Sequence, residues 1–278
     1  MRLSPSQIKV FMECPQMWKY SYIDNLALNR ERRTFDNGLY FHQLVHNLYQ
    51  LMEANPQYKP GSDFLMEAMR SRINSDLGHA TSDNISVMAT VIPIFQQYLQ
   101  VQSPRIDAGI TVLGVEQEIK VEWEDGIILH GYIDLIYRQY NREKVRDHKT
   151  STKPNAWSDD KVQLEGQLLL YLLAWSILQG RPVTETEVNF INLYSYKEEP
   201  PLDKRFRVFS VMHDPRTIEG FGTNLRKIHK NMVDMNITRN LGSHCGNCAF
   251  MKLCQSEIRG DNIEGIKANY YVDKDSLK

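Results

Sequence analysis

The sequence has no apolar run long enough to cross a membrane. A spanning helix needs about 20 consecutive, mostly apolar residues, and the 278 residues contain no such stretch. The first ten residues, MRLSPSQIKV, also lack the apolar core of a secretory signal peptide. We therefore expect a cytoplasmic protein with no membrane contact.

The sequence also lacks a strong net charge. Its 33 Lys and Arg residues against 34 Asp and Glu residues give a net charge of -1. This excludes a general basic coat for nucleic acid, so a DNA-binding surface would have to be a local groove. Basic residues gather in two segments, at Arg30, Arg32 and Arg33 and at Arg142, Lys144, Arg146, Lys149 and Lys153. Such runs are usually solvated faces, so they predict no function by themselves.

Internal repeats, low-complexity tracts and Gly/Ser linkers are absent too, and the length fits one large domain spanning 1–278. The chain has no Gly-x-x-x-x-Gly-Lys-Ser/Thr loop for nucleotide phosphates. It therefore carries no helicase motor of its own, although a helicase can still act as a partner.

Apolar spacing predicts a mixed α/β protein, with a central sheet flanked by helices. Ser4 is expected to cap the first helix, with Pro5 at its first position and Gln7 closing a capping box. A long apolar helix at 161–179 is expected to cross over between two parallel strands. The other expected elements are a helix at 39–52, a largely helical segment at 62–100 broken near Gly78 and Pro93, strands at 111–123, 126–138, 143–151, 188–196 and 205–211, and a helix at 215–235.

Two carboxylates and a lysine are predicted to meet on one β-hairpin. Asp147 and Lys149 are two residues apart on a strand, so their side chains share a face. If the preceding turn is centred on Tyr140-Asn141, Asp134 falls directly opposite Asp147. The alternative is a cross-strand salt bridge on a solvated hairpin, which would contribute roughly 0.2–1 kcal/mol.

Such a group of side chains suits phosphodiester hydrolysis. Carboxylates bind a hard divalent cation such as Mg²⁺ or Mn²⁺, which activates water and neutralises charge developing on the phosphate. A neighbouring lysine can orient or deprotonate the attacking water.

Three further polar residues lie on predicted helices. His42 borders the apolar stripe of the 39–52 helix and can offer a ring nitrogen to a metal, whereas His46, one turn later, raises a rival His-x-x-x-His zinc pair that lacks a third ligand. Gln167 and Tyr171 are four residues apart, on one face of an otherwise apolar helix. A buried amide must be hydrogen-bonded, so this pair is expected to form the polar wall of a pocket.

The four cysteines form one pattern. Cys245, Cys248 and Cys254 are spaced C-x2-C-x5-C, and Cys14 lies alone near the start of the chain. Four thiolates suit a tetrahedral zinc ion or a 4Fe–4S cluster, and disulfides are not expected in the cytoplasm. The cysteines therefore predict a metal centre that joins the two ends of the chain.

Taken together, these motifs resemble the PD-(D/E)xK nuclease superfamily, and within it the RecB-type and AddB-type nuclease domains and the CRISPR-associated iron–sulfur exonucleases. The opening LSPSQIKVFMECPQMWKYSY, the segments GLYFH, GYIDLI, DHKTS and QLLLY, and the cysteine arrangement are similar to the family's motifs, in the same order along nearly the whole chain. The departure is His148, where the family often has an aromatic or aliphatic residue. Its side chain is expected to face away from the site.

The resemblance implies a restriction-endonuclease-like fold and a role for each matching residue. Segments 1–25 and 240–260 would form an iron–sulfur subregion, and 55–105 a helical insertion. His42, Asp134 and Asp147 would bind Mg²⁺ or Mn²⁺ together with the backbone carbonyl of His148, Lys149 would activate the water, Gln167 and Tyr171 would support the site and contact DNA, and Cys14, Cys245, Cys248 and Cys254 would hold a 4Fe–4S cluster.

The expected function is a metal-dependent exonuclease acting on DNA ends, with single strands or frayed ends as the substrate that the resemblance implies. A helicase, or another recombination or CRISPR protein, is the expected kind of partner. Three alternatives stay open: a structure-specific endonuclease, a non-catalytic iron–sulfur adaptor that binds DNA ends, and a structural protein held together by zinc.

Overall fold

The computed structural model describes residues 1–29, 36–124 and 126–277, so Arg30, Arg32 and Arg33 lie outside the described residues. The contacts divide the chain into two compact units. As far as they are described, one unit comprises Met1–Thr34, Glu124–Ile128 and Gly222–Lys278, and the other comprises Phe35–Trp123 and Leu129–Phe221. We call them the terminal unit and the sheet unit. No described helix has the length and apolar character needed to span a membrane.

The sheet unit contains the central sheet and the helices on both of its faces. Its helical elements are α3 (Asn37–Ala54), α4 (Asp63–Gly78), α5 (Ile85–Gln97), η2 (Tyr98–Gln102), α6 (Ser103–Ile106), α7 (Asp159–Gln163), α8 (Gly166–Gln179), α9 (Leu202–Arg205) and the start of α10 (Pro215–Val233). Its strands are β3 (Thr111–Glu124), β4 (Ile127–Gln139), β5 (Arg142–Ser151), β6 (Glu185–Asn192) and β7 (Phe206–Met212), apart from the hairpin tip between β3 and β4.

The sheet is mixed, as its sequence predicts. Its strands follow the order β4-β5-β6-β7, with β3 paired to β4. β5 and β6 run parallel, whereas the β4–β5 and β6–β7 pairs are antiparallel. Because α8 connects the two parallel strands, the predicted crossover is confirmed.

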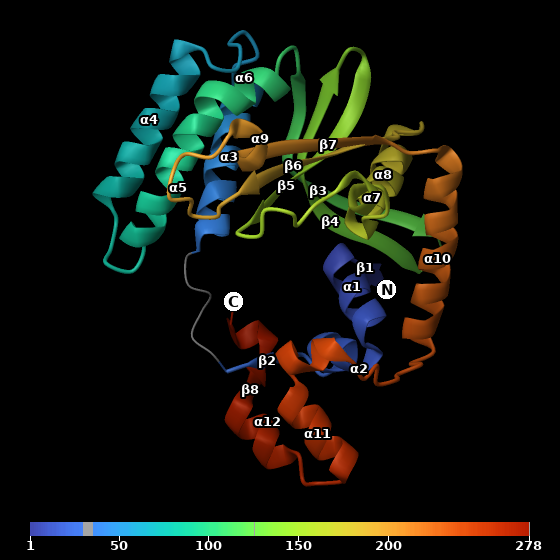
Figure 1. The fold of residues 1–278 in the computed structure, drawn as a ribbon. Helices are drawn as coiled ribbons and strands as arrows, with labels where there is room; N and C mark the ends of the chain where they lie inside the picture. The colour runs from blue at the N-terminus through green and yellow to red at the C-terminus, as the bar shows by residue number, and fades with distance from the viewer. Residues whose placement is uncertain (30–35, 125, 278) are drawn as a thin grey trace. The chain divides into compact units, whose positions relative to one another are not determined.

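Two apolar cores hold helices against opposite faces of this sheet (Figure 1). The larger core joins α3, α4 and α5 to sheet residues such as Tyr137 and Ile191. The smaller core joins α7 and α8 to Val188, Phe190 and Phe209. Neighbouring residues of a strand point to opposite faces, so consecutive side chains of β6, Phe190 and Ile191, enter different cores. β6 is consequently buried along its whole length.

Two predicted helix boundaries are wrong. α5 continues through Pro93, because its buried face, including Val91, Ile94 and Phe95, is held by the larger core. The predicted helix at 161–179 is instead two helices, α7 and α8. Ser158 caps α7 by accepting a hydrogen bond from Lys161 N, and the chain breaks at Leu164, whose side chain is 76% exposed.

The terminal unit brings together both predicted iron–sulfur segments. Its elements are β1 (Arg2–Leu3), α1 (Pro5–Glu13), α2 (Pro15–Trp18), η1 (Lys19–Ile23), β2 (Leu26–Leu28), the end of α10, η3 (Ser243–Asn247), α11 (Met251–Arg259), α12 (Glu264–Tyr270), β8 (Tyr271–Asp273) and η4 (Lys274–Leu277). Ser4 caps α1 by accepting from Gln7 N at 3.3 Å, as predicted. A small core of Tyr20, Phe250, Leu253 and Tyr271 packs beneath an antiparallel β2–β8 pair.

Candidate active site and cysteine cavity

The β4–β5 hairpin aligns the two predicted carboxylates. Tyr140 and Asn141 have φ of 49° and 61°, which is the left-handed geometry of a tight two-residue hairpin turn. The register pairs Leu135 with Arg146, and one further step along the same register sets Asp134 opposite Asp147. The turn lies where the sequence predicts it.

Asp147, Lys149 and Gln167 form a connected polar group. Gln167, in the first turn of α8, accepts from Lys149 Nζ at 3.1 Å and donates to Asp147 Oδ1 at 2.9 Å. It also donates to Tyr171 Oη at 3.1 Å. Lys149 Nζ also forms an ion pair with Asp147 Oδ2 at 2.8 Å. The predicted helix face therefore does point its amide at the predicted strand pair.

The two carboxylates are buried together, and this raises their pKa values. Burial and the neighbouring Asp134 raise the pKa of Asp147 to about 7. Burial raises the pKa of Asp134 to about 6, although its Oδ2 accepts a 2.7 Å hydrogen bond from His148 N. Burial opposes the charge on Lys149, but Asp147 and Asp134 outweigh it and raise the pKa of the ammonium. The positive charge of Lys149 is therefore too small to bring the pKa values of Asp134 and Asp147 back to their ordinary range.

His42 reaches the same group from the start of α3. Asp36 caps the helix by accepting from Leu39 N at 2.8 Å, and a Cβ on Gly38 would lie 2.8 Å from the Thr150 hydroxyl oxygen. Gly38 therefore permits α3 to begin against the end of β5. Burial lowers the pKa of His42, and Asp147 and Lys149 are the nearest charges acting on it. The imidazole is thus neutral at pH 7 and able to act as a ligand.

His148 points to the other face of β5, as expected. Its ring stacks on Tyr49 at 5.3 Å and its Nδ1 lies 3.0 Å from Asn189 Nδ2. Beyond them, Arg146 is fully buried and binds Asp107 at 2.5 Å and Glu187 at 2.9 Å. This network fixes the strand that carries Asp147 and Lys149.

Three of the basic residues noted in the sequence belong to ion pairs within the sheet unit. Arg142 binds Glu185 at 2.8 Å, Lys144 lies 3.2 Å from Glu187, and Arg146 is buried as described above. Protein carboxylates therefore pair with these three cations of the run.

Glu116 is an acidic residue of the site that sequence reasoning missed. It lies on β3 with φ of 47°, a left-handed conformation that interrupts strand alternation and redirects the side chain. Burial and Asp147 raise its pKa, and it acts in turn on Asp134. The acidic pattern VEQE gave no signal, because ordinary alternation cannot distinguish Glu116 from Glu118.

As the side chains stand, no group of three or more His, Cys, Asp or Glu residues within the described ranges is arranged to hold a metal ion. Lys149 lies against one carboxylate and His148 N against the other. The donor set nevertheless fits Mg²⁺ or Mn²⁺, which prefer oxygen ligands. A bound cation would stabilise the charged forms of Asp134 and Asp147, whose pKa values are raised by burial. Among the described residues, no third ligand accompanies the His42–His46 pair.

All four cysteines line one cavity of about 150 Å³ in the terminal unit. Cys14 is buried and follows α1, whereas the other three come from the segment around η3 and α11. Burial raises the pKa of the Cys248 thiol, and the other three sulfurs add to the effect. Arg239 lies beside Cys254 and pairs with Glu257. The structure therefore brings the predicted thiols together around a cavity, not onto a single point.

Comparison with known proteins gives one family match. The model of the PD-(D/E)XK nuclease superfamily matches residues 2–255, whereas no curated protein matches significantly. Among solved structures, a protein described as an exonuclease from Eubacterium rectale has 11% identity and a TM-score of 0.49, covering 84% of this chain and 79% of that one. An alkaline exonuclease from Laribacter hongkongensis has 12% identity and a TM-score of 0.31, covering 71% and 88%. A phage-related exonuclease from Haemophilus somnus has 13% identity and a TM-score of 0.32, covering 70% and 94%.

Proposed function

The chain belongs to the PD-(D/E)XK nuclease superfamily, and from this premise we propose that it is a metal-dependent exonuclease that hydrolyses DNA from its ends. The observation that carries the proposal is the group formed by Asp147, Lys149 and Gln167 opposite Asp134. A purely DNA-binding adaptor has no need for buried Asp147 beside the half-buried Asp134 and Lys149, because taking charged groups out of water costs stability.

Asp134, Asp147, His42 and the backbone carbonyl of His148 are the residues that would hold Mg²⁺ or Mn²⁺, and Glu116 joins them as an additional candidate. When bound, the cation supplies Lewis-acid polarisation of the phosphate and activation of water. Lys149 orients the water through its ammonium and offsets charge that develops on the phosphate. Gln167 holds Lys149 through Oε1 and Asp147 through Nε2, which fixes the distance between these two groups.

The assay compares the wild-type chain with Lys149→Ala on end-labelled linear DNA and on closed circles, with Mn²⁺ or Mg²⁺ against EDTA. We expect degradation of linear DNA that requires the cation and falls by about 10²–10⁴-fold in Lys149→Ala. Cleavage of closed circles would make it an endonuclease. If the wild-type chain binds DNA but cuts neither substrate, the adaptor is the better account.

We propose in addition that Cys14, Cys245, Cys248 and Cys254 hold a 4Fe–4S cluster that stabilises the terminal unit. Thiols spread around a cavity of about 150 Å³ suit a cluster better than a single zinc ion, since zinc requires four sulfurs within about 2.3 Å of one point. Protein purified without oxygen should be brown with broad visible absorbance. A colourless protein with one bound zinc would show that the four cysteines hold zinc and not a cluster.

The remaining expectations, which rest on the sequence and on the resemblance, stay predictions. They are the cytoplasmic location, the RecB-type or AddB-type subgroup, and a helicase or another recombination or CRISPR protein as partner.

A further inference from the structure

A groove at the end of the sheet gathers cations that the proposed catalytic group does not use. It has a volume of about 710 Å³, and its walls come from α6, the loop after β5, the start of α7, the segment around α9 and the start of β7. All of these elements belong to the sheet unit. Arg105, Lys204 and Arg207 line it, together with the ring of Tyr196.

The cations of this groove have no protein carboxylate as partner. Arg105 and Lys204 are exposed, and among the described residues neither side chain takes part in an ion pair or a hydrogen bond. This differs from Arg142, Lys144 and Arg146 on the sheet, which all bind acids. Cations that gather without counter-charges from the protein favour an anionic ligand.

Arg207 connects the groove with the catalytic face of the sheet. The register pairs Lys149 with Phe190 and Phe190 with Arg207, so the three side chains form a row across β5, β6 and β7. Two strand spacings put the Cα atoms of Arg207 and Lys149 about 10 Å apart. The guanidinium lies 5.6 Å from the ring centres of Phe190 and Phe209 and donates to Pro154 O through Nη2, while its Nε is buried. Nη1 makes no hydrogen bond to a described residue, so it is the donor left for a phosphate.

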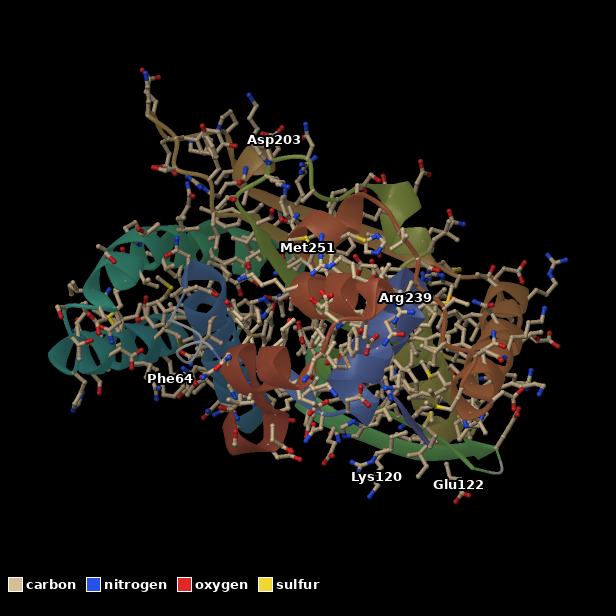
Figure 2. All side chains as sticks on the ribbon, turned by 90° about the horizontal axis from the view of Figure 1, so that it is seen from below. Phe64, Lys120, Glu122, Asp203, Arg239 and Met251 are labelled. Carbon is tan, nitrogen blue, oxygen red and sulfur yellow. The ribbon has the colours of Figure 1, made fainter. Side chains whose placement is uncertain are left out.

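The two acids of the groove do not cancel its cations. Asp159 and Asp203 line the groove, and among the described residues neither forms an ion pair with its cations. Figure 2 shows Asp203 at one margin of the sheet unit, with Lys120 at the opposite side of the view. Three cations thus face two carboxylates, which leaves the groove with a positive balance.

The aromatic residues favour a single strand over a duplex. Tyr194 is 48% exposed, and its ring contacts Tyr196 with the centroids 5.0 Å apart. The Arg205 guanidinium lies 5.1 Å from the centre of the Tyr196 ring, so Tyr194 is the ring of the pair that a base can reach. Bases of single-stranded DNA stack on exposed rings, whereas the base faces of a duplex are already stacked on one another.

On the basis of the proposed nuclease function, we propose that this groove binds the single-stranded DNA backbone adjacent to the bond that is cut. Arg105, Lys204 and Arg207 contact its phosphates, and Tyr194 stacks with a base. The groove thereby directs one strand across β7 toward Lys149.

The test measures binding of a fluorescent single-stranded oligonucleotide by anisotropy, in the full chain carrying Lys149→Ala so that the DNA stays intact. Arg105→Ala and Lys204→Ala are exposed substitutions and should each weaken affinity about three- to tenfold. Each should also reduce the slope of log affinity against log salt by about 0.7, the value for one phosphate contact on a single strand. Lys120→Ala removes the same charge from an exposed position outside the groove and serves as the matched control.

Two further variants cover the remaining contacts. Arg207→Gln keeps a donor for Pro154 O but removes the charge, and should weaken binding while the protein stays folded by circular dichroism. Tyr194→Leu keeps the bulk but should abolish the fluorescence change of a stacked 2-aminopurine base.

If the groove variants match Lys120→Ala in affinity and salt slope, the groove does not bind DNA. If duplex DNA loses as much affinity as the single strand, the choice of a single strand is wrong. Failure of the nuclease proposal would be seen separately, because it concerns cleavage by the chain that retains Lys149.

Discussion

Replacing Gln167 by Leu should slow cleavage without preventing the fold. Leu is close in volume to Gln and compatible with α8, whose neighbouring residues Leu168, Leu169 and Leu170 are all buried. The substitution removes the acceptor of Lys149 Nζ and the donor to Asp147 Oδ1. Lys149 is then held by its ion pair with Asp147 Oδ2 at 2.8 Å, without the amide that fixes its position beside the carboxylate.

The magnitude follows from these two bonds. A hydrogen bond to a charged group contributes about 1.5–3 kcal/mol when buried, but solvent partly replaces it here because the Lys149 side chain is 28% exposed. A net loss of about 1.4–2.7 kcal/mol corresponds to a cleavage rate about 10- to 100-fold lower, in line with other residues that orient catalytic groups.

Single-turnover cleavage at saturating DNA measures this rate separately from binding. Tyr171→Phe is the matched control, since it removes only the neutral bond to Gln167 and should cost less than about tenfold. The affinity for DNA is measured separately for both variants, because the resemblance also assigns DNA contacts to Gln167 and Tyr171. A Gln167→Leu rate within about threefold of wild type would show that Gln167 does not position the lysine.

Three other outcomes are expected. Glu116→Gln should weaken Mn²⁺ binding in calorimetry by about tenfold. Glu122→Gln changes an exposed residue of the same strand and should leave the affinity for Mn²⁺ unchanged. Equal affinities in the two variants would exclude Glu116 as a metal ligand. Asp107→Ala should lower the free energy of unfolding in urea by about 3 kcal/mol, because buried Arg146 loses one of its two carboxylates and the buried Tyr49 and Ser103 hydroxyls lose their acceptor, and a loss below about 1 kcal/mol would contradict that account. Cys245→Ser should abolish the visible absorbance and lower the melting temperature, and a variant that keeps its colour would exclude this thiol as a ligand.

The parts of the site that are local in sequence could be predicted. Tyr140-Asn141 marks a two-residue turn, and a turn of fixed length sets the register of the strands on either side. The position of Asp134 opposite Asp147 follows by counting residues. Gln167 could be placed on a polar face because a buried amide needs partners.

Helix boundaries could not be predicted with the same success. Pro93 normally ends a helix because it removes a hydrogen bond and clashes with the preceding turn, yet burial of the surrounding apolar face outweighs that cost in α5. The break between α7 and α8 is equally non-local. Leu164 belongs to the apolar pattern of the sequence, but its side chain is 76% exposed.

Glu116 and Arg207 show why the rest of the site required a structure. The role of Glu116 depends on one left-handed backbone conformation that alternation does not predict. Arg207 lies 58 positions beyond Lys149, and only the pairing of β5 with β6 and of β6 with β7 puts the two cations in one row. Motif spacing therefore predicts Asp134, Asp147, Lys149 and Gln167, the groups proposed to act on the bond to be cut, because they lie on one hairpin and one helix. The residues that guide the rest of the strand are brought together by sheet order, so Arg105→Ala and Lys204→Ala test a surface that no sequence motif marks.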